Sequence, residues 1–133
     1  MREPAWLSRD LALALHDRVL SDFGGAPGLR DPGLLDSALA RPRQLHAYAK
    51  PGVTDLAAAY ATGILRNHPF VDGNKRVAFL LAYVFLARNG FNLTAPEAQA
   101  TCAVFDLASG SISEEAFALW LADHLEPRDR GTP

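Results

Sequence analysis

The alternation of hydrophobic and polar positions predicts helices along most of the chain. After Ser8, a residue type favoured at helix N-caps, apolar residues recur at helical spacing until Gly24-Gly25 interrupts them. Asp31 and Pro32 are residue types that favour the start of a second helix. We expect Arg41-Pro42 to end it, because a proline inside a helix removes a backbone hydrogen bond.

The middle of the chain has a weakly patterned segment followed by an alanine-rich one. Arg43–Gly52 shows no clear period, and we interpret it as an exposed loop or a short flap. A third helix then begins at Thr54 or Asp55, and its alanines allow close packing. It ends near Asn67, because the proline two residues further on disfavours helical geometry at the residue between them.

The most apolar segment, Val77–Leu86, predicts the central helix of the fold. This helix begins around Gly73 or Asn74 and ends at Asn89-Gly90. Its apolar residues cover every face, which indicates a helix that is buried on all sides. We therefore expect it to be the hub of an all-α bundle, the fold class that the other predicted helices also favour.

Shorter elements are predicted toward the C-terminal end. An extended piece at Phe91–Leu93 precedes a helix that starts after Pro96 and ends at Gly110. Ser113 caps the last helix, with acidic residues in its first turn. The polar residues 126–133 are expected to form a frayed tail.

Composition and charge exclude several classes of protein. A chain of 133 residues without internal repeats suits a single domain. Its hydrophobic content of 49% is higher than that of disordered chains. The net charge of −2 gives no basic field for direct contact with nucleic acid. The apolar run is too short to span a membrane, and no signal-like leader opens the chain. With one cysteine and therefore no internal disulfide, these features indicate a cytoplasmic protein.

The polar stretch that precedes the central helix concentrates the candidate binding groups. Residues 68–76 read His-Pro-Phe-Val-Asp-Gly-Asn-Lys-Arg. The free N–H groups and the positive dipole at the start of a helix attract anions. Gly73 allows backbone to come close to a ligand, while Lys75 and Arg76 add positive charge. The stretch therefore predicts a phosphate site.

Two residues in the same stretch are candidates for chemistry on a nucleotide. His68 can accept a proton, and Asp72 can bind a divalent cation. Each also has a structural interpretation, because His68 could only cap or connect parts of the loop and Asp72 could cap the following helix. Lys75 and Arg76 could be solvated charges, but two cations beside a glycine at a buried helix start favour phosphate binding.

Polar residues outside this stretch are interpreted structurally. His16, His46 and His124 are isolated, and we expect them to be structural or exposed. Arg30-Asp31 is interpreted as a turn and helix cap, with a role in a partner surface as the less favoured alternative. Cys102 lies on an apolar helical face and is expected in the core.

Residues 68–76 resemble the signature of the Fic/Doc superfamily, and more narrowly that of its Doc (death-on-curing) toxins from type II toxin–antitoxin pairs. Other segments also resemble the Doc branch, namely Leu15-His16-Asp17, Gly24-Gly25, Gly28–Pro32, Leu35, Ala38-Leu39, Phe85–Gly90 and residues 110–120. The resemblance therefore extends over nearly the whole chain and implies an all-helical bundle.

The resemblance also implies roles for individual residues in a transfer from ATP to a protein hydroxyl. The catalytic histidine of the family falls on His68, and its Mg²⁺-binding acid falls on Asp72. The phenylalanine of the motif falls on Phe70, which should pack beneath the loop and hold it rigid. The anion-binding loop of the family falls on Gly73, Asn74, Lys75 and Arg76.

Doc toxins that this chain resembles phosphorylate a threonine of the translation factor EF-Tu, and a Phd-type antitoxin covers their active-site groove with its C-terminal segment. The resemblance therefore implies a kinase-like toxin that uses ATP and Mg²⁺ and arrests protein synthesis. EF-Tu and a Phd-like antitoxin are the implied partners. We expect the antitoxin segment to fold into a groove near Arg43–Gly52.

Two other functions stay open within the superfamily. Fic proteins that transfer AMP carry glycine where this chain has Lys75 and a second arginine where it has Phe79. Both differences favour phosphate transfer, although AMP transfer with the same histidine remains an alternative. An inactive relative that only binds a partner is the other, and the intact motif argues against it. No segment matches the Fic inhibitory pattern, so control is expected from a separate chain.

Overall fold

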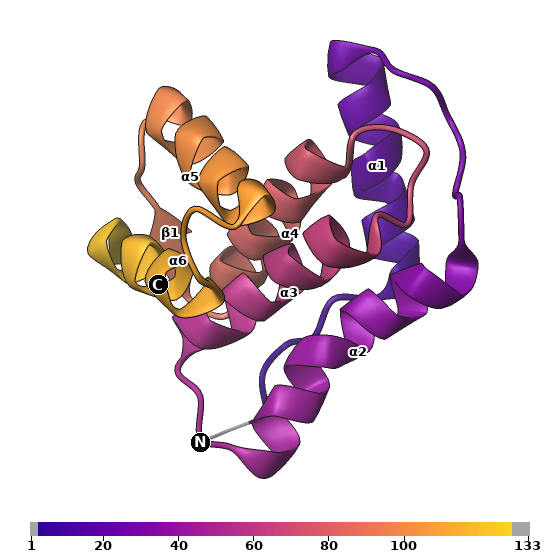
Figure 1. The fold of residues 1–133 in the computed structure, drawn as a ribbon. Coiled ribbons are helices and arrows are strands. Elements are labelled where there is room, and N and C mark those ends of the chain that lie inside the picture. Colours follow the sequence, from indigo (N-terminus) through magenta and orange to yellow (C-terminus); the bar gives the residue numbers. More distant parts are fainter. Residues whose placement is uncertain (1–2, 129–133) are drawn as a thin grey trace, which may run out of the picture.

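The structure is a computed structural model that describes residues 3–128, and these residues form a helical bundle with a small sheet (Figure 1). The elements in chain order are α1 (Arg9–Phe23), α2 (Pro32–Tyr48), α3 (Val53–Asn67), α4 (Asn74–Arg88), β1 (Phe91–Leu93), α5 (Glu97–Ser109), α6 (Glu114–Asp123) and β2 (Leu125–Pro127). The predicted all-α fold is confirmed, with a two-stranded sheet as the addition. No helix in the described range is long and apolar enough to cross a membrane.

The predicted caps explain where three of the helices, α1, α2 and α6, begin. The side chain of Ser8 accepts a hydrogen bond from the N–H of Leu11, and α1 stops before Gly24. The side chain of Asp31 accepts from Leu34 at the start of α2, and Ser113 caps α6 in the same way. These side chains satisfy N–H groups that the first turn of a helix leaves free.

Helix α2 does not end at Arg41-Pro42 but continues to Tyr48, so the prediction of a loop or flap over Arg43–Gly52 is wrong for its first six residues. Pro42 is one of the buried residues on the face of α2 that packs against α3. A proline removes only one backbone hydrogen bond, and packing of an apolar face outweighs that loss here. Sequence signals for a helix end therefore failed because tertiary contacts decided the outcome.

Helix α3 is the hub of the bundle. All nine residues from Leu56 to Ile64 are buried, and the helix contacts α2, α4, α5 and α6. Its small side chains allow this close approach, most tightly where Gly63 faces Ala38 of α2. The hydroxyl of Tyr60 accepts a hydrogen bond from the N–H of Leu7, and burial raises the pKa of that hydroxyl above its ordinary value.

Helix α4, which we expected to be buried on all sides, is buried on one side only. Leu81, Ala82 and Phe85 are fully buried, whereas Leu80 is partly buried and Tyr83 is 40% exposed. Neighbouring elements cover the face toward α3, but the opposite apolar face remains open. The prediction of a central buried helix therefore fits α3 better than α4.

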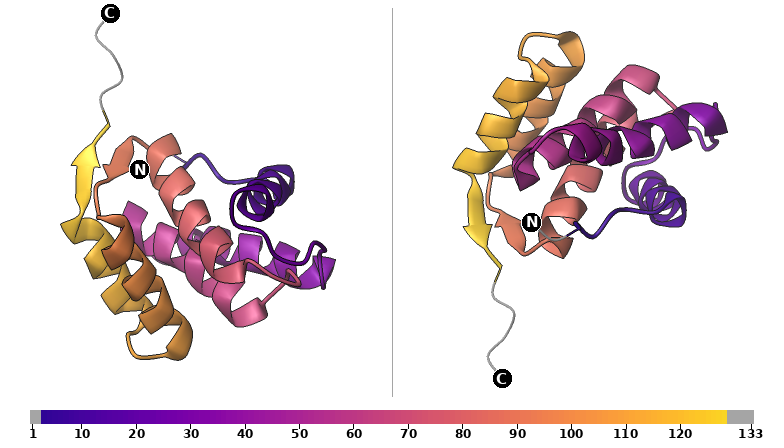
Figure 2. Two further views of the ribbon diagram at one scale, coloured as in Figure 1. Left: turned by 90° about the horizontal axis from the view of Figure 1, so that it is seen from above. Right: turned by 90° about the horizontal axis from the view of Figure 1, so that it is seen from below.

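The C-terminal part corrects two further predictions. β2 pairs antiparallel with β1, with Leu93 opposite Leu125, so Glu126 and Pro127 form a strand instead of a frayed tail (Figure 2). The N–H of Arg128 also donates to the carbonyl of Gly90, and residues 129–133 of the predicted tail lie outside the described range. Cys102, expected in the core, is exposed, because α5 buries Ala100, Ala103 and Val104 on its other face.

Candidate active site

The predicted signature forms the turn between α3 and α4, so the bundle core holds it from both ends. His68 follows the last residue of α3 and adopts a left-handed conformation, with φ 50° and ψ 56°. Among the described residues it is the only one other than glycine with a positive φ. Pro69 disfavours a helical conformation at the residue before it, and this is why α3 ends here. His68 is exposed, so its imidazole is accessible to a substrate.

The backbone carbonyls around His68 are held by the residue pair that precedes α2. The Nε atom of Arg30 donates to the carbonyl of His68 at 2.8 Å, and its Nη2 atom donates to the carbonyl of Asn67 at 2.9 Å. The backbone N–H groups of Arg30 and Asp31 both donate to the carbonyl of Pro69. Asp31 is a cap as expected, whereas the contact of Arg30 with the signature loop had no signal in the sequence.

The centre of the loop is fixed by Phe70 and Asn74. Phe70 is 1% exposed and lies beneath the loop. The side chain of Asn74 donates to the carbonyl of Phe70 at 2.9 Å and accepts from the N–H of Phe70 at 3.1 Å. Because both polar atoms of this buried amide bond Phe70, Asn74 can offer only its backbone N–H to an anion at the helix start.

His16 of α1 also supports the loop, although its position in the sequence gave no indication of this. Its ring stacks on Phe70 with 3.9 Å between centroids and an interplanar angle of 11°. Its Nε2 atom lies 2.9 Å from the carbonyl oxygen of Asp72. A carbonyl oxygen can only accept, so Nε2 carries the proton. The expectation of a structural histidine is therefore correct, and its role is at the signature loop.

The Asp72 carboxylate ties the signature loop to the linker between α1 and α2. Its Oδ2 atom accepts from the N–H of Ala26 at 3.2 Å, and its Oδ1 atom accepts from the N–H of Gly73 at 2.9 Å. Gly25 has φ +119°, and a Cβ there would lie 2.9 Å from Oδ2, so only glycine fits. Gly73 is the N-cap of α4 and no side chain caps this helix, so Asp72 is not its N-cap.

A magnesium ion at this position would have one carboxylate from the chain. The described residues contain no group of three or more His, Cys, Asp or Glu side chains that could hold a metal. Mg²⁺ is commonly bound by one or two carboxylates together with substrate phosphates and water, so a single exposed Asp72 fits this donor set. The carboxylate keeps lone pairs beyond its two hydrogen bonds and can still act as a ligand.

Five signature residues line one pocket of about 380 Å³ together with Leu65 and Ala108, namely His68, Asp72, Gly73, Asn74 and Lys75. The first backbone bond of α4 runs from the N–H of Val77 to the carbonyl of Gly73. The three preceding N–H groups therefore have no partner within the helix and favour an anion at its start. The pocket therefore brings an imidazole, a carboxylate and the free N–H groups of a helix start together.

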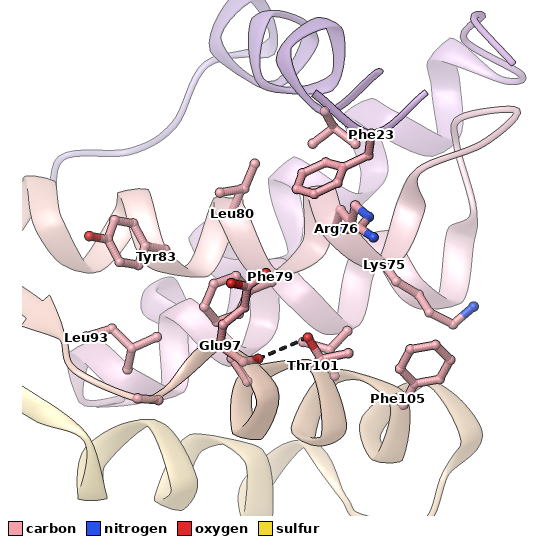
Figure 3. A pocket seen from close by; sticks show the side chains of 14 residues that line it. Phe23, Lys75, Arg76, Phe79, Leu80, Tyr83, Leu93, Glu97, Thr101 and Phe105 are labelled. Carbon is pink, nitrogen blue, oxygen red and sulfur yellow. Dashed lines mark hydrogen bonds between the residues drawn. The ribbon is translucent and has the colours of Figure 1, made fainter. Parts of the chain in front are cut away.

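Arg76 is the one predicted phosphate-binding residue that does not line this pocket. Its Cζ atom lies 3.6 Å from the centre of the Phe23 ring, and Figure 3 shows it below that ring. Arg76 faces a second cavity of about 460 Å³, which we call the apolar groove, formed mainly by Val19 and Phe23 of α1, Phe79, Leu80 and Tyr83 of α4, and Ala100, Val104 and Phe105 of α5. Lys75 lines both cavities, with its Nζ atom 5.3 Å from the Phe105 ring.

Comparison with known proteins gives a consistent result. A family model described as the Fic/DOC family matches residues 6–86. The chain is 36% identical over 123 residues to "Protein kinase doc" of Escherichia phage P1, covering 90% of this chain and 91% of that protein. It is 50% identical over 76 residues to "Toxin Doc" of Mycolicibacterium smegmatis, covering 55% of this chain and 58% of that protein.

Proposed function

The chain belongs to the Fic/DOC family, and from this premise we propose that it is a toxin that transfers the γ-phosphate of ATP to a serine or threonine hydroxyl of a translation factor, EF-Tu. The names of the two relatives, a protein kinase and a toxin, support this proposal. The observation that carries it is the single pocket lined by His68, Asp72, Gly73 and Lys75. Action on a translation factor would take place in the cytoplasm.

The proposed reaction begins with the hydroxyl of the protein substrate beside His68. The imidazole takes the hydroxyl proton while the oxygen forms a bond to the γ-phosphorus, and the bond to the bridging oxygen breaks to release ADP. Asp72 would hold Mg²⁺, which when bound neutralises charge on the phosphate oxygens. The free N–H groups at the start of α4 and the Lys75 ammonium bind the transferred phosphate.

The residues at two positions favour phosphate transfer over AMP transfer. Fic-type AMP transferases have glycine where this chain has Lys75, whose side chain occupies the boundary between the pocket and the apolar groove. They have a second arginine where this chain has Phe79, an apolar wall residue of the groove that cannot bind a phosphate. The γ-phosphate of ATP therefore binds at the start of α4, in reach of His68.

The position of the radioactive label on ATP decides between the two reactions. The protein is incubated with EF-Tu and ATP labelled at the γ-phosphate or at the α-phosphate. We expect label on EF-Tu only from the γ position, and none with a His68→Ala variant. Label transferred from the α position would instead establish AMP transfer. No transfer from either position, with a folded protein and Mg²⁺ present, would contradict both reactions.

A toxin of this kind has an antitoxin partner, and we propose that a Phd-like antitoxin inserts a C-terminal helix into the apolar groove. The groove is open and lined mostly by apolar side chains, with the Lys75 and Arg76 cations at one end (Figure 3). An amphipathic helix with an acidic residue at that end matches this surface. The expected site near Arg43–Gly52 is less suitable, because Gly52 and His68 flank opposite ends of α3.

Hydrogen exchange with and without the antitoxin tests this location. Protection is expected along the groove faces of α1, α4 and α5. A Tyr83→Lys variant, which places a charge in the groove away from the signature, should lose antitoxin affinity while keeping the transfer activity. Protection confined to the C-terminal turns of α2 would contradict the proposal.

A further inference from the structure

We propose that Arg30 is a positioning residue that holds His68 in its reactive orientation. The proposal concerns a residue outside the signature and rests on the proposed function, in which His68 accepts the proton of the substrate. Arg30 belongs to the linker between α1 and α2, and it reaches the end of α3 across a sequence separation of 38 residues. Its guanidinium bonds the carbonyls of the two peptide groups that flank His68.

Arg30 binds three successive carbonyl groups at the point where α3 ends. Its side chain donates to the carbonyls of Asn67 and His68 at 2.9 and 2.8 Å. Its backbone N–H donates to the carbonyl of Pro69 at 2.6 Å. The last carbonyls of a helix have no partner within the helix and carry its negative dipole, so a cation with two donors in a fixed plane matches them closely.

The conformation of His68 explains why this contact matters. The backbone of His68 is left-handed, with φ 50°. Residues other than glycine adopt this conformation at a cost in free energy. Such a conformation persists only where surrounding contacts determine it. The two hydrogen bonds from the Arg30 side chain hold the peptide groups on both sides of His68, and thereby fix the direction of its Cα–Cβ bond.

The backbone of Arg30 is itself held in place, so its side chain starts from a fixed position. Leu29 forms an antiparallel bridge with Phe70, and the N–H of Val71 donates to the carbonyl of Gly28. Asp31 then begins α2 as its N-cap. Loss of the guanidinium would consequently release the carbonyls of Asn67 and His68 while leaving the linker paired with the loop. Because Arg30 is exposed, loss of its side chain should leave the bundle core intact.

The kinetic consequence is specific. ATP binds through the start of α4, which Arg30 does not contact, whereas proton transfer requires the imidazole in line with the substrate hydroxyl. In an Arg30→Ala variant we expect kcat for transfer to EF-Tu to fall ~10–100-fold, because a small misplacement of a reacting group is costly. The KM for ATP should change by less than about twofold, since ground-state binding is preserved.

Chemical rescue separates positioning from general damage. Because Arg30 is exposed, guanidinium ion at concentrations far below those that unfold proteins can enter the space left by Arg30→Ala. We expect it to restore part of kcat, whereas equal sodium chloride does not. Arg30→Lys, with a single ammonium in place of the planar fork, should give intermediate kcat. Arg88→Ala, which removes an exposed arginine at the far end of α4, is the matched control and should keep full activity.

Amide hydrogen exchange tests the contact between Arg30 and the loop without relying on the transfer reaction. Exchange of the His68 backbone N–H, which bonds the Ile64 carbonyl at the end of α3, should accelerate in Arg30→Ala and slow again with guanidinium, whether or not EF-Tu is the substrate. If wild-type protein transfers no label but exchange changes as stated, the function is wrong and the loop contact is correct. Unchanged kcat in a folded Arg30→Ala, a rise in KM alone, or unchanged exchange would each overturn the role of Arg30.

Discussion

Helices α3 and α4 lie side by side in the bundle, yet they serve different purposes. α3 is rich in alanine, and nine consecutive residues of it are buried. α4 has larger apolar side chains on every face, but the side that carries Phe79, Leu80 and Tyr83 lines an open groove. The candidate chemistry lies at the junction of the two, where α3 ends and α4 begins.

The difference follows from side-chain size. Small residues let neighbouring helices approach a helix from several sides, as α2, α4, α5 and α6 approach α3. Large side chains keep neighbours apart and form the walls of a cavity where no neighbour fills the space. α3 therefore supplies stability, and α4 supplies the open surfaces at which we propose that ligands and partners bind. Changes at the α3–α4 junction should therefore remove chemistry without stability, and changes in the packing around α3 and α4 should do the reverse.

The largest effect is expected for His68→Ala, which removes the proposed base just beyond the end of α3. The transfer rate should fall ~10²–10⁴-fold, the usual contribution of a positioned base. The free energy of unfolding should change by less than about 1 kcal/mol, because the side chain is exposed. Urea unfolding and label transfer to EF-Tu measure the two quantities.

The matched variant His68→Gly sharpens this test. Glycine adopts the left-handed conformation of residue 68 without strain, so this variant should be at least as stable as His68→Ala and equally inactive. A folded His68→Ala protein with undiminished transfer would remove the histidine from the reaction and separate the chemistry from the α3–α4 junction.

The adjacent residues Leu80 and Leu81 compare the two sides of α4 directly. Leu81 is fully buried, and Leu81→Ala should lower the free energy of unfolding by about 2–5 kcal/mol through lost contacts and a cavity. Leu80 lines the groove and is only partly buried, so Leu80→Ala should cost about 1 kcal/mol. Equal losses in urea unfolding would show that both faces of α4 bear on stability and would contradict the division between the helices.

Much of the fold was predictable because local signals and tertiary packing agree. Ser8, Gly24, Asp31 and Ser113 act as caps where their residue types indicated. The failures occur where packing outweighs a local signal. Pro42 lies within α2, and the polar residues after Leu125 pair with β1. The burial of α3 could not be read from periodicity, since it depends on how many neighbours approach.

In the candidate site, too, local features were predictable from the sequence and long-range contacts were not. His68, Asp72 and Lys75 are close in sequence, and the turn between α3 and α4 brings their side chains to one pocket. Their proximity could therefore be predicted from the sequence. The sequence could not indicate that Arg76 turns toward Phe23, away from that pocket. Nor could it indicate the supports from His16 and Arg30, because these are contacts across 56 and 38 residues of sequence.

A smaller effect is expected for Asp72→Asn, which changes the charge just before α4. The amide oxygen can replace one of the two hydrogen-bond acceptor atoms, so the loop should remain folded. The affinity for ATP in the presence of Mg²⁺ should fall ~10–100-fold, while affinity without Mg²⁺ changes little. Isothermal titration with and without Mg²⁺ measures both. Equal losses in the two titrations would leave Asp72 with a structural role only.

The smallest effect is expected for Gly63→Ala, which tests the close approach of α3 to α2. An added Cβ would lie 3.1 Å from the Cα, Cβ and carbonyl oxygen of Ala38, and a backbone contact cannot move away without shifting a helix. Overpacking of this kind costs about 1–3 kcal/mol. Alanine also favours a helix over glycine by about 1 kcal/mol, so the net loss should be about 1 kcal/mol.

An exposed site supplies the control for that balance. Ala14 is exposed within α1, so Ala14→Gly should report the helix propensity alone, a loss of about 1 kcal/mol. If Gly63→Ala lowers the free energy of unfolding despite this favourable propensity, the contact with Ala38 is as tight as the structure indicates. If Gly63→Ala instead raises the free energy of unfolding by as much as Ala14→Gly lowers it, the interface between α2 and α3 has space for an added methyl group. Small residues would then not explain why α3 is buried on all sides.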